Sequence, residues 1–142
     1  MSDHGSIGSD SLEGWRILVV DDEDDVRTFL LTAFADAGAE ICEAEDGAQA
    51  IRMAQAYRPD LITLDLSMPG HDGAAAFAEL RKTPGIEEVP VCIVTGHPEM
   101  RSLIYGRPPP EGFLTKPVTP EKLVATVRRI LALKARKLAH TH

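Results

Sequence analysis

Cysteine is scarce in this sequence of 142 residues, which contains only Cys42 and Cys92. Each of them lies in its own apolar stretch, and the two stretches predict separate strands. Disulfide frameworks are typical of small secreted proteins with many cysteines, so this pattern argues against one. We expect both thiols to be reduced core residues of a cytoplasmic protein.

Long apolar runs and an excess of positive charge are also missing. No stretch approaches the roughly 18 consecutive apolar residues of a membrane span, and residues 1–14 contain no apolar run of the kind that export signals need. Lysine and arginine number 15 against 22 aspartates and glutamates, which gives a net charge of −7. We therefore expect neither a membrane nor nucleic acid as a direct partner.

The composition that remains is that of a folded domain. Hydrophobic residues make up 44% of the chain and charged residues 26%, which is ordinary for a globular protein. The length fits one domain with a real core. We predict a flexible polar leader at residues 1–14, a single domain at residues 15–137 and a C-terminal tail at residues 138–142.

Five apolar segments alternate with segments of helical periodicity. The predicted strands are residues 16–20, 39–44, 60–66, 89–95 and 112–116. The predicted helices are residues 23–37, 47–57, a stretch that includes 74–80, a weak helix at 98–105, and 119–137. Gly38 follows the first helix as a stop signal, and Thr119 precedes Pro120 as an N-cap of the last. Strands and helices that alternate with short connections predict an α/β, flavodoxin-like doubly wound fold, a five-stranded parallel sheet in the order 2-1-3-4-5 with helices on both faces.

Chemistry is expected beyond the carboxyl ends of these strands, where such folds bind their ligands. The predicted strand ends carry Asp21, Asp22, Asp65, Thr95 and Lys116. Clustered carboxylates repel one another unless a cation or a proton neutralises them, which favours a hard metal such as Mg²⁺. The Asp65 carboxylate could attack phosphorus to form an aspartyl phosphate, while Lys116 and Thr95 could bind the phosphate oxygens.

Each of these residues also has an ordinary structural explanation. Asp21 and Asp22 could cap the first helix, and Asp65 could form a turn. Lys116 could be a solvated lysine, and Thr95 could be a β-branched strand residue. All five at the ends of four strands of one predicted sheet favour a functional site.

Four segments of the chain resemble the receiver domains of two-component response regulators. They are Val19-Val-Asp-Asp-Glu23, Leu64-Asp-Leu-Ser-Met-Pro-Gly-His-Asp-Gly73, Val94-Thr-Gly96 and Phe113-Leu-Thr-Lys-Pro117. The resemblance spans roughly residues 16–134 and is to the single-domain type of the chemotaxis regulators. It implies that Asp65 is the phosphoacceptor. It also implies that Mg²⁺ is held by Asp21, Asp22, Asp65 and the backbone carbonyl of Ser67, with Asp22 a more direct ligand than Asp21.

The same resemblance implies a conformational switch. Lys116 would pair with the phosphoryl group, and capture of that group by Thr95 would be coupled to an inward rotation of the Phe113 ring. The Lys116-Pro117 peptide bond is expected to be cis.

In this family the positions of Ser67 and His97 tune the lifetime of the phosphoryl group. We hypothesise that His97 affects the rate at which the phosphoryl group is lost. A surface histidine without such a role is an equal alternative. An unchanged rate of phosphoryl loss in a His97 variant would favour this alternative.

Two features depart from the family pattern or extend it. The segment Arg107-Pro-Pro-Pro110 falls where a fourth helix usually continues, and consecutive prolines predict a short helix. A rigid loop and an altered partner surface are both open explanations. The last helix is basic and could be a solvated helix end, a docking site for an acidic partner, or the beginning of a linker to an output domain. Its basic residues are Arg128, Arg129, Lys134, Arg136 and Lys137.

The sequence thus predicts a phosphorelay receiver that takes a phosphoryl group from a sensor histidine kinase or a phosphotransfer protein. It would act on an unidentified downstream protein, with a homodimer as one possibility, and would catalyse only its own phosphorylation and slow dephosphorylation. A phosphohydrolase would need a carboxylate two residues after Asp65, where Ser67 stands. A nucleotide-binding domain would need a glycine-rich phosphate loop after the first strand, and none is present. A purely structural relative of the receivers is the third alternative.

Overall fold

The computed structural model describes residues 11–69, 72–104 and 108–140, which form a five-stranded parallel sheet with helices around it. The strands are β1 (Arg16–Val20), β2 (Glu40–Ala44), β3 (Leu61–Leu64), β4 (Val91–Thr95) and β5 (Gly112–Thr115). The helices are α2 (Asp24–Asp36), α3 (Gly47–Tyr57), α4 (Asp72–Leu80) and α5 (Pro120–His140), with a 3-10 helix, η2 (Pro98–Ile104), between β4 and β5. The strand order is β2-β1-β3-β4-β5, which confirms the predicted flavodoxin-like fold.

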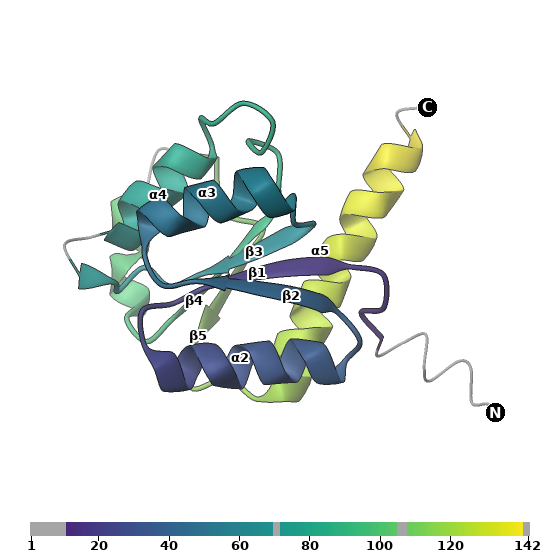
Figure 1. Cartoon of the computed structure of the whole chain (residues 1–142), viewed down its shortest axis with the longest axis horizontal. Coiled ribbons are helices and arrows are strands. Elements are labelled where there is room, and N and C mark those ends of the chain that lie inside the picture. Colours follow the sequence, from purple (N-terminus) through teal and green to yellow (C-terminus); the bar gives the residue numbers. More distant parts are fainter. Residues whose placement is uncertain (1–10, 70–71, 105–107, 141–142) are drawn as a thin grey trace.

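The helices form one layer on each face of the sheet. Figure 1 shows α3 and α4 on one side and α2 and α5 on the other. Successive residues of a strand enter the two cores alternately: Ile17 and Val19 pack beneath α2 and α5, whereas Leu18 and Val20 pack beneath α3 and α4. The central strands β3 and β4 are buried throughout, which explains why they appear in the sequence as continuous apolar runs.

Two predicted helix boundary signals are confirmed, one at the end of α2 and one at the beginning of α5. Gly38 has a φ of +98° and follows α2, a conformation that glycine adopts without steric cost. The Thr119 hydroxyl accepts a hydrogen bond of 3.1 Å from the Lys122 amide at the beginning of α5. The predicted boundaries of β3 and β4 were too wide, because the regular pairing with neighbouring strands covers only part of each apolar run.

The described structure continues past both predicted bounds of the domain, residues 15 and 137. Residues 1–10 of the predicted leader lie outside the described residues, but Leu12 is fully buried in the core beneath α2 and α5. Its amide also donates a hydrogen bond of 2.7 Å to the carbonyl of Ala37. A single apolar residue has no periodicity, so no sequence pattern predicts this packing. At the other end α5 continues to His140, three residues beyond the predicted helix, and Figure 1 shows its last turns projecting away from the sheet.

The short fourth helix is confirmed as the seven-residue η2. Arg107 lies outside the described residues, and Pro108 to Pro110 have no regular secondary structure. Arg81 of the loop after α4 holds this segment, because its guanidinium donates to the carbonyl of Pro109 at 2.9 Å and pairs with Glu111 at 3.0 Å.

Both cysteines are free thiols, as expected. Cys92 is buried in the core beneath α2 and α5, and this burial raises its pKa to about 12. A thiol with so high a pKa remains protonated and unreactive at neutral pH, so Cys92 acts as a packing residue. Among the helices of the described residues, none combines the length and the apolar character that a membrane crossing requires.

Candidate functional site

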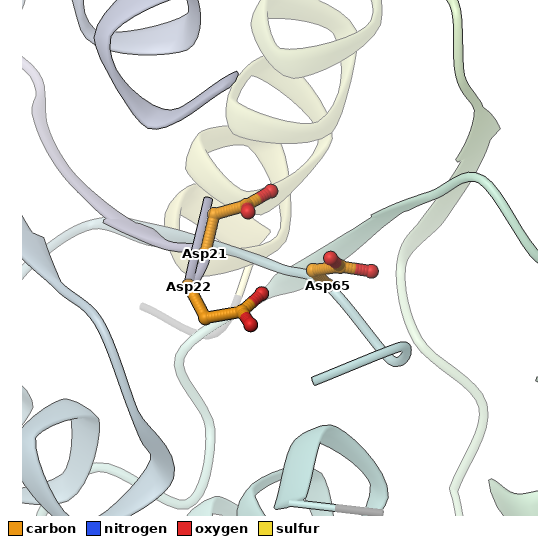
Figure 2. Close-up of side chains that lie close together, drawn as sticks. All are labelled: Asp21, Asp22 and Asp65. Carbon is orange, nitrogen blue, oxygen red and sulfur yellow. The ribbon is translucent and has the colours of Figure 1, made fainter. Parts of the chain in front are cut away.

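Three carboxylates meet at the carboxyl end of the sheet. Asp21 follows β1 and Asp65 follows β3, and these strands are parallel neighbours in which Val20 lies opposite Leu64. Asp22 adds a third carboxylate, and one oxygen from each of the three lies within 4.8 Å of the others (Figure 2). Asp21 and Asp65 are almost completely buried, whereas Asp22 is partly exposed. The structure therefore brings together the three acidic residues that the sequence predicts, with an open side at Asp22.

Lys116, which follows β5, provides the positive charge of this cluster. Its Nζ lies 2.9 Å from Oδ2 of Asp21 and 3.3 Å from Oδ2 of Asp65. The carboxylate of Glu23 lies 3.8 Å from the same Nζ. The sequence prediction did not include Glu23, although its place directly after the acidic pair was the available signal.

The pKa values of the cluster reflect its burial and its charges. Burial raises the pKa of the Asp21 carboxyl, and hydrogen bonds from Lys116 and from the Glu23 amide only partly offset this effect. Burial alone would lower the pKa of Lys116, but the hydrogen bond and charge of Asp21, together with those of Asp65, raise it above its ordinary value. Lys116 is therefore protonated at neutral pH and compensates part of the negative charge.

Ser67 holds the other oxygen of the Asp65 carboxylate. Oδ1 of Asp65 accepts hydrogen bonds from the Ser67 amide at 2.9 Å and from the Ser67 hydroxyl at 2.7 Å. Oδ2 of Asp65 faces Lys116, so both oxygens of the carboxylate have donors. The sequence prediction concerned the Ser67 backbone carbonyl and did not anticipate these two contacts.

Thr95 lies at the end of β4 and is fully buried. Its carbonyl accepts a hydrogen bond of 2.8 Å from the Lys116 amide, and its hydroxyl accepts one of 3.2 Å from the amide of His97. Within the described residues no hydrogen bond joins Thr95 to a carboxylate of the cluster. His97 itself is exposed, and its Nδ1 lies 3.3 Å from a carboxylate oxygen of Glu99.

Phe113 lies on the side of the sheet covered by α3 and α4. It is partly buried, and its ring packs against the core on that side. The guanidinium of Arg101, from η2, lies 4.0 Å from the centre of the ring, a cation–π contact that the sequence did not reveal. The cis Lys116-Pro117 peptide bond is confirmed.

The cluster fits a divalent cation that prefers oxygen ligands. Its three carboxylates have ligand atoms close enough to share one ion, two of them are fixed in the buried end of the sheet, and the third opens to solvent. Mg²⁺ accepts such a site because it usually binds one or two carboxylates and keeps several waters. Lys116 alone leaves an excess of negative charge here, which a cation would reduce.

Comparisons with known proteins agree with this geometry. A model of the family described as "Response regulator receiver domain" matches residues 17–128. The chain is 36% identical over 121 residues to protein Rrf1 of Nitratidesulfovibrio vulgaris, with 85% of this chain and 86% of Rrf1 covered. It is 37% identical over 117 residues to the transcriptional regulatory protein PrrA of Mycobacterium tuberculosis. The matched residues cover 82% of this chain but only 49% of PrrA. The chain thus spans about half the length of that relative.

Among solved structures, the chemotaxis response regulator CheY4 of Vibrio cholerae has a TM-score of 0.72 at 30% sequence identity. The match covers 82% of this chain and 98% of the other. The likeness therefore extends over almost the whole length of that chain.

Proposed function

The chain belongs to the receiver domain family of response regulators, and we propose that it accepts a phosphoryl group on Asp65 and thereby changes what it binds. Receiver domains are signalling modules of two-component systems rather than conventional enzymes. The observation that carries the proposal is the position of the Asp65 carboxylate, buried at a strand end, beside Asp21 and Asp22, with Lys116 Nζ at 3.3 Å. A buried carboxylate in such a place requires partners or a function.

In the proposed reaction an oxygen of Asp65 attacks the phosphorus of a phosphohistidine. A phosphorus–oxygen bond forms as the phosphorus–nitrogen bond breaks, and the imidazole nitrogen leaves with the electron pair and takes a proton from solvent. Attack by water on the aspartyl phosphate later restores the carboxylate and releases inorganic phosphate. This slow loss of the group would be the only other reaction of the domain.

Asp21, Asp22, Asp65 and the backbone carbonyl of Ser67 would hold Mg²⁺ in this scheme. When bound, the ion would offset the negative charge of the transferring group. Lys116, which lies against Asp65, would move its ammonium toward the oxygens of the phosphoryl group. The hydroxyl of Thr95 would exchange its contact with the His97 amide for one with the same group.

The proposed output is a change at the surface around η2, β5 and α5. Capture of the phosphoryl group by Thr95 would favour an inward position of the Phe113 ring, which is now packed at the edge of the core beneath α3 and α4. Response regulators act between histidine kinases and downstream targets, so a sensor kinase or a phosphotransfer protein is the proposed donor. The match covers only 49% of PrrA, so the partners of that whole protein are not carried over to this chain. A downstream protein partner and a homodimer are part of the proposal.

A phosphohydrolase is the less favoured alternative. Such an enzyme would need an acid–base carboxylate two residues after its nucleophile, and here that position is Ser67, whose hydroxyl donates to Asp65. Ser67 cannot perform that proton transfer as a carboxylate would.

Intact-mass measurement after incubation with acetyl phosphate and Mg²⁺ tests the proposed function. We expect the wild-type chain to gain the mass of one phosphoryl group, and Asp65→Asn or chelation of the metal to prevent the gain. Asp46→Asn is the matched control, because Asp46 caps α3 by accepting a hydrogen bond from Gln49 and lies outside the cluster. A gain that persists in Asp65→Asn, or no gain in the wild type, would refute the proposal.

The contact between Arg101 and Phe113 yields a prediction about the switch. An exposed cation–π contact stabilises by about 0.5–1 kcal/mol, which corresponds to a factor of about 2–5 in a population. Arg101→Gln should therefore release the ring toward its inward position and increase the initial rate of phosphorylation by acetyl phosphate about 2–5-fold. The mass assay measures this rate. In a Phe113→Leu background the same substitution should have no effect, and an equal increase there would mean that Arg101 acts otherwise.

A further inference from the structure

Arg27 is a charged residue of α2 whose guanidinium is buried, with only 11% of the side chain exposed. Three acceptors surround it. Nη1 donates to the backbone carbonyl of Asp21 at 2.8 Å, Nε to a carboxylate oxygen of Glu43 at 2.7 Å, and Nη2 to one of Asp24 at 2.6 Å. One side chain thus joins the end of β1, the first turn of α2 and strand β2.

The carbonyl that Arg27 holds belongs to the peptide group between Asp21 and Asp22. The amide of Asp21 is fixed as well, since it donates to the carbonyl of Ala44 at 3.1 Å. By contrast, the carboxylate of Asp22 forms no hydrogen bond or ion pair within the described part of the chain. The direction of the Asp22 side chain therefore depends on the orientation of its backbone, and Arg27 holds the peptide that sets this orientation.

We propose that Arg27 is a positioning residue for the divalent-cation site, because it fixes the Asp21–Asp22 peptide and so directs the Asp22 carboxylate toward Asp21 and Asp65. This inference rests on the proposed function, in which these carboxylates hold Mg²⁺. Replacement of a residue that orients a metal ligand by hydrogen bonding, without touching the metal, typically weakens metal affinity by about 10–100-fold.

Geometry and charge predict opposite effects at this position. Removal of a positive charge near the carboxylates should strengthen their attraction for a cation. Loss of the fixed orientation of the Asp22 carboxylate should instead weaken Mg²⁺ binding. Arg27→Lys retains the charge but lacks the planar fork that reaches three acceptors at once. If Arg27 acts by positioning, both Arg27→Lys and Arg27→Met bind Mg²⁺ more weakly.

The experiment is a titration of the unphosphorylated chain of 142 residues with Mg²⁺, in which amide chemical shifts in NMR spectra report binding. We expect the dissociation constant to increase about tenfold in Arg27→Lys and in Arg27→Met. The matched control is Arg16→Met, because Arg16 has the same kinds of partner at the opposite end of β1. It donates to the carbonyl of Tyr57 at 2.8 Å and pairs with Glu40 at 3.2 Å. Its loss should lower the free energy of unfolding but leave the dissociation constant for Mg²⁺ within about twofold.

A second measurement separates binding from reaction. In Arg27→Lys the Mg²⁺ concentration for half-maximal phosphorylation by acetyl phosphate should rise about tenfold, while the rate at saturating Mg²⁺ should stay within about threefold of the wild type. If Arg27 only stabilised the fold, its replacement would not raise the Mg²⁺ requirement while leaving the rate at saturating Mg²⁺ nearly unchanged.

The outcomes distinguish the two levels of the proposal. If the wild type binds Mg²⁺ and is phosphorylated but folded Arg27 variants bind the ion equally well, only the positioning role is overturned. If the wild type does not bind Mg²⁺, the proposed function fails together with it. Should Arg27→Met not fold, Arg27→Lys decides, because its charge still compensates Glu43 and Asp24.

Discussion

Gly73→Ala should lose about 3 kcal/mol of its free energy of unfolding, the upper end of the usual cost of overpacking, although it adds only one methyl group. Gly73 lies in the first turn of α4, where alanine would ordinarily favour the helix by about 1 kcal/mol. Here a Cβ would overlap the carbonyl oxygen of Asp65 and would lie 2.6 Å from the Cα of Leu66. Both are backbone atoms that follow β3, so relief requires a shift of α4 or of the chain that carries the phosphoacceptor.

Urea unfolding measures this loss, with Gly96→Ala as the control. A Cβ at Gly96 would meet no atom within 4 Å, so alanine there should change the free energy of unfolding by no more than about 1 kcal/mol. Any Gly73→Ala molecules that fold should also be phosphorylated poorly, since the strain falls on Asp65 itself. A Gly73→Ala variant as stable as the wild type would show that α4 lies farther from β3 than the structure indicates.

Lys116→Met should cost about 3 kcal/mol of unfolding free energy at pH 7 in the absence of divalent cations. Its ammonium is the positive group beside the buried carboxylates of Asp21 and Asp65, and removal of one partner from a buried ion pair is typically that costly. Methionine has a similar length and leaves no large cavity. The loss would therefore be electrostatic.

The pH dependence of this variant follows from Asp21. Burial already raises the pKa of the Asp21 carboxyl in the folded wild type, and the opposing effect of Lys116 would be absent in the variant. A carboxyl whose folded pKa exceeds its unfolded value makes a contribution to stability that is complete below the unfolded pKa and is lost as the pH rises through the folded pKa. The deficit of Lys116→Met should therefore be small near pH 4 and grow toward neutral pH. Added Mg²⁺ should reduce the deficit, because the ion and the lysine compensate the same carboxylates.

Unfolding in urea at pH 4.5 and pH 7.5, with chelator and then with Mg²⁺, checks this expectation. Lys134→Met is the control, since the Nζ of Lys134 donates to the carbonyl of Asp60 at 3.3 Å, at the end of β3 opposite to the cluster. That variant should differ from the wild type by less than about 1 kcal/mol at both pH values. A deficit in Lys116→Met that does not change with pH would contradict the electrostatic explanation.

Much of the site follows from local sequence patterns because parallel strands bring their carboxyl ends to one edge. The apolar runs before Asp21 and Asp65 mark two strand ends, and the adjacency of β1 and β3 in a doubly wound sheet makes the two carboxylates neighbours. The fold class follows from the same alternation of strands and helices, and the observed strand order is that of the flavodoxin-like type of this class. Each of these predictions uses only period, end signals and connection length, which the sequence contains directly.

Contacts between elements could not be obtained in this way. Lys116 follows β5 and Asp21 follows β1, with β3 and β4 between them, and the long Lys116 side chain spans this part of the sheet edge to reach Asp21. Arg27 is an ordinary helical residue by its spacing, and only the packing of α2 against β2 buries its guanidinium among three acceptors. Arg101 meets Phe113 for the same reason, through the path of η2 over β5.

By itself, then, the sequence determined the alternation of strands and helices, the edge at which the carboxylates gather and the residue types found there, since periodicity and strand ends are properties of neighbouring residues. The tertiary structure alone decided the burial of Leu12, the close approach of Gly73 to Asp65 and the partners of Arg27. These depend on distances between segments remote in the sequence, which packing fixes and no local pattern encodes.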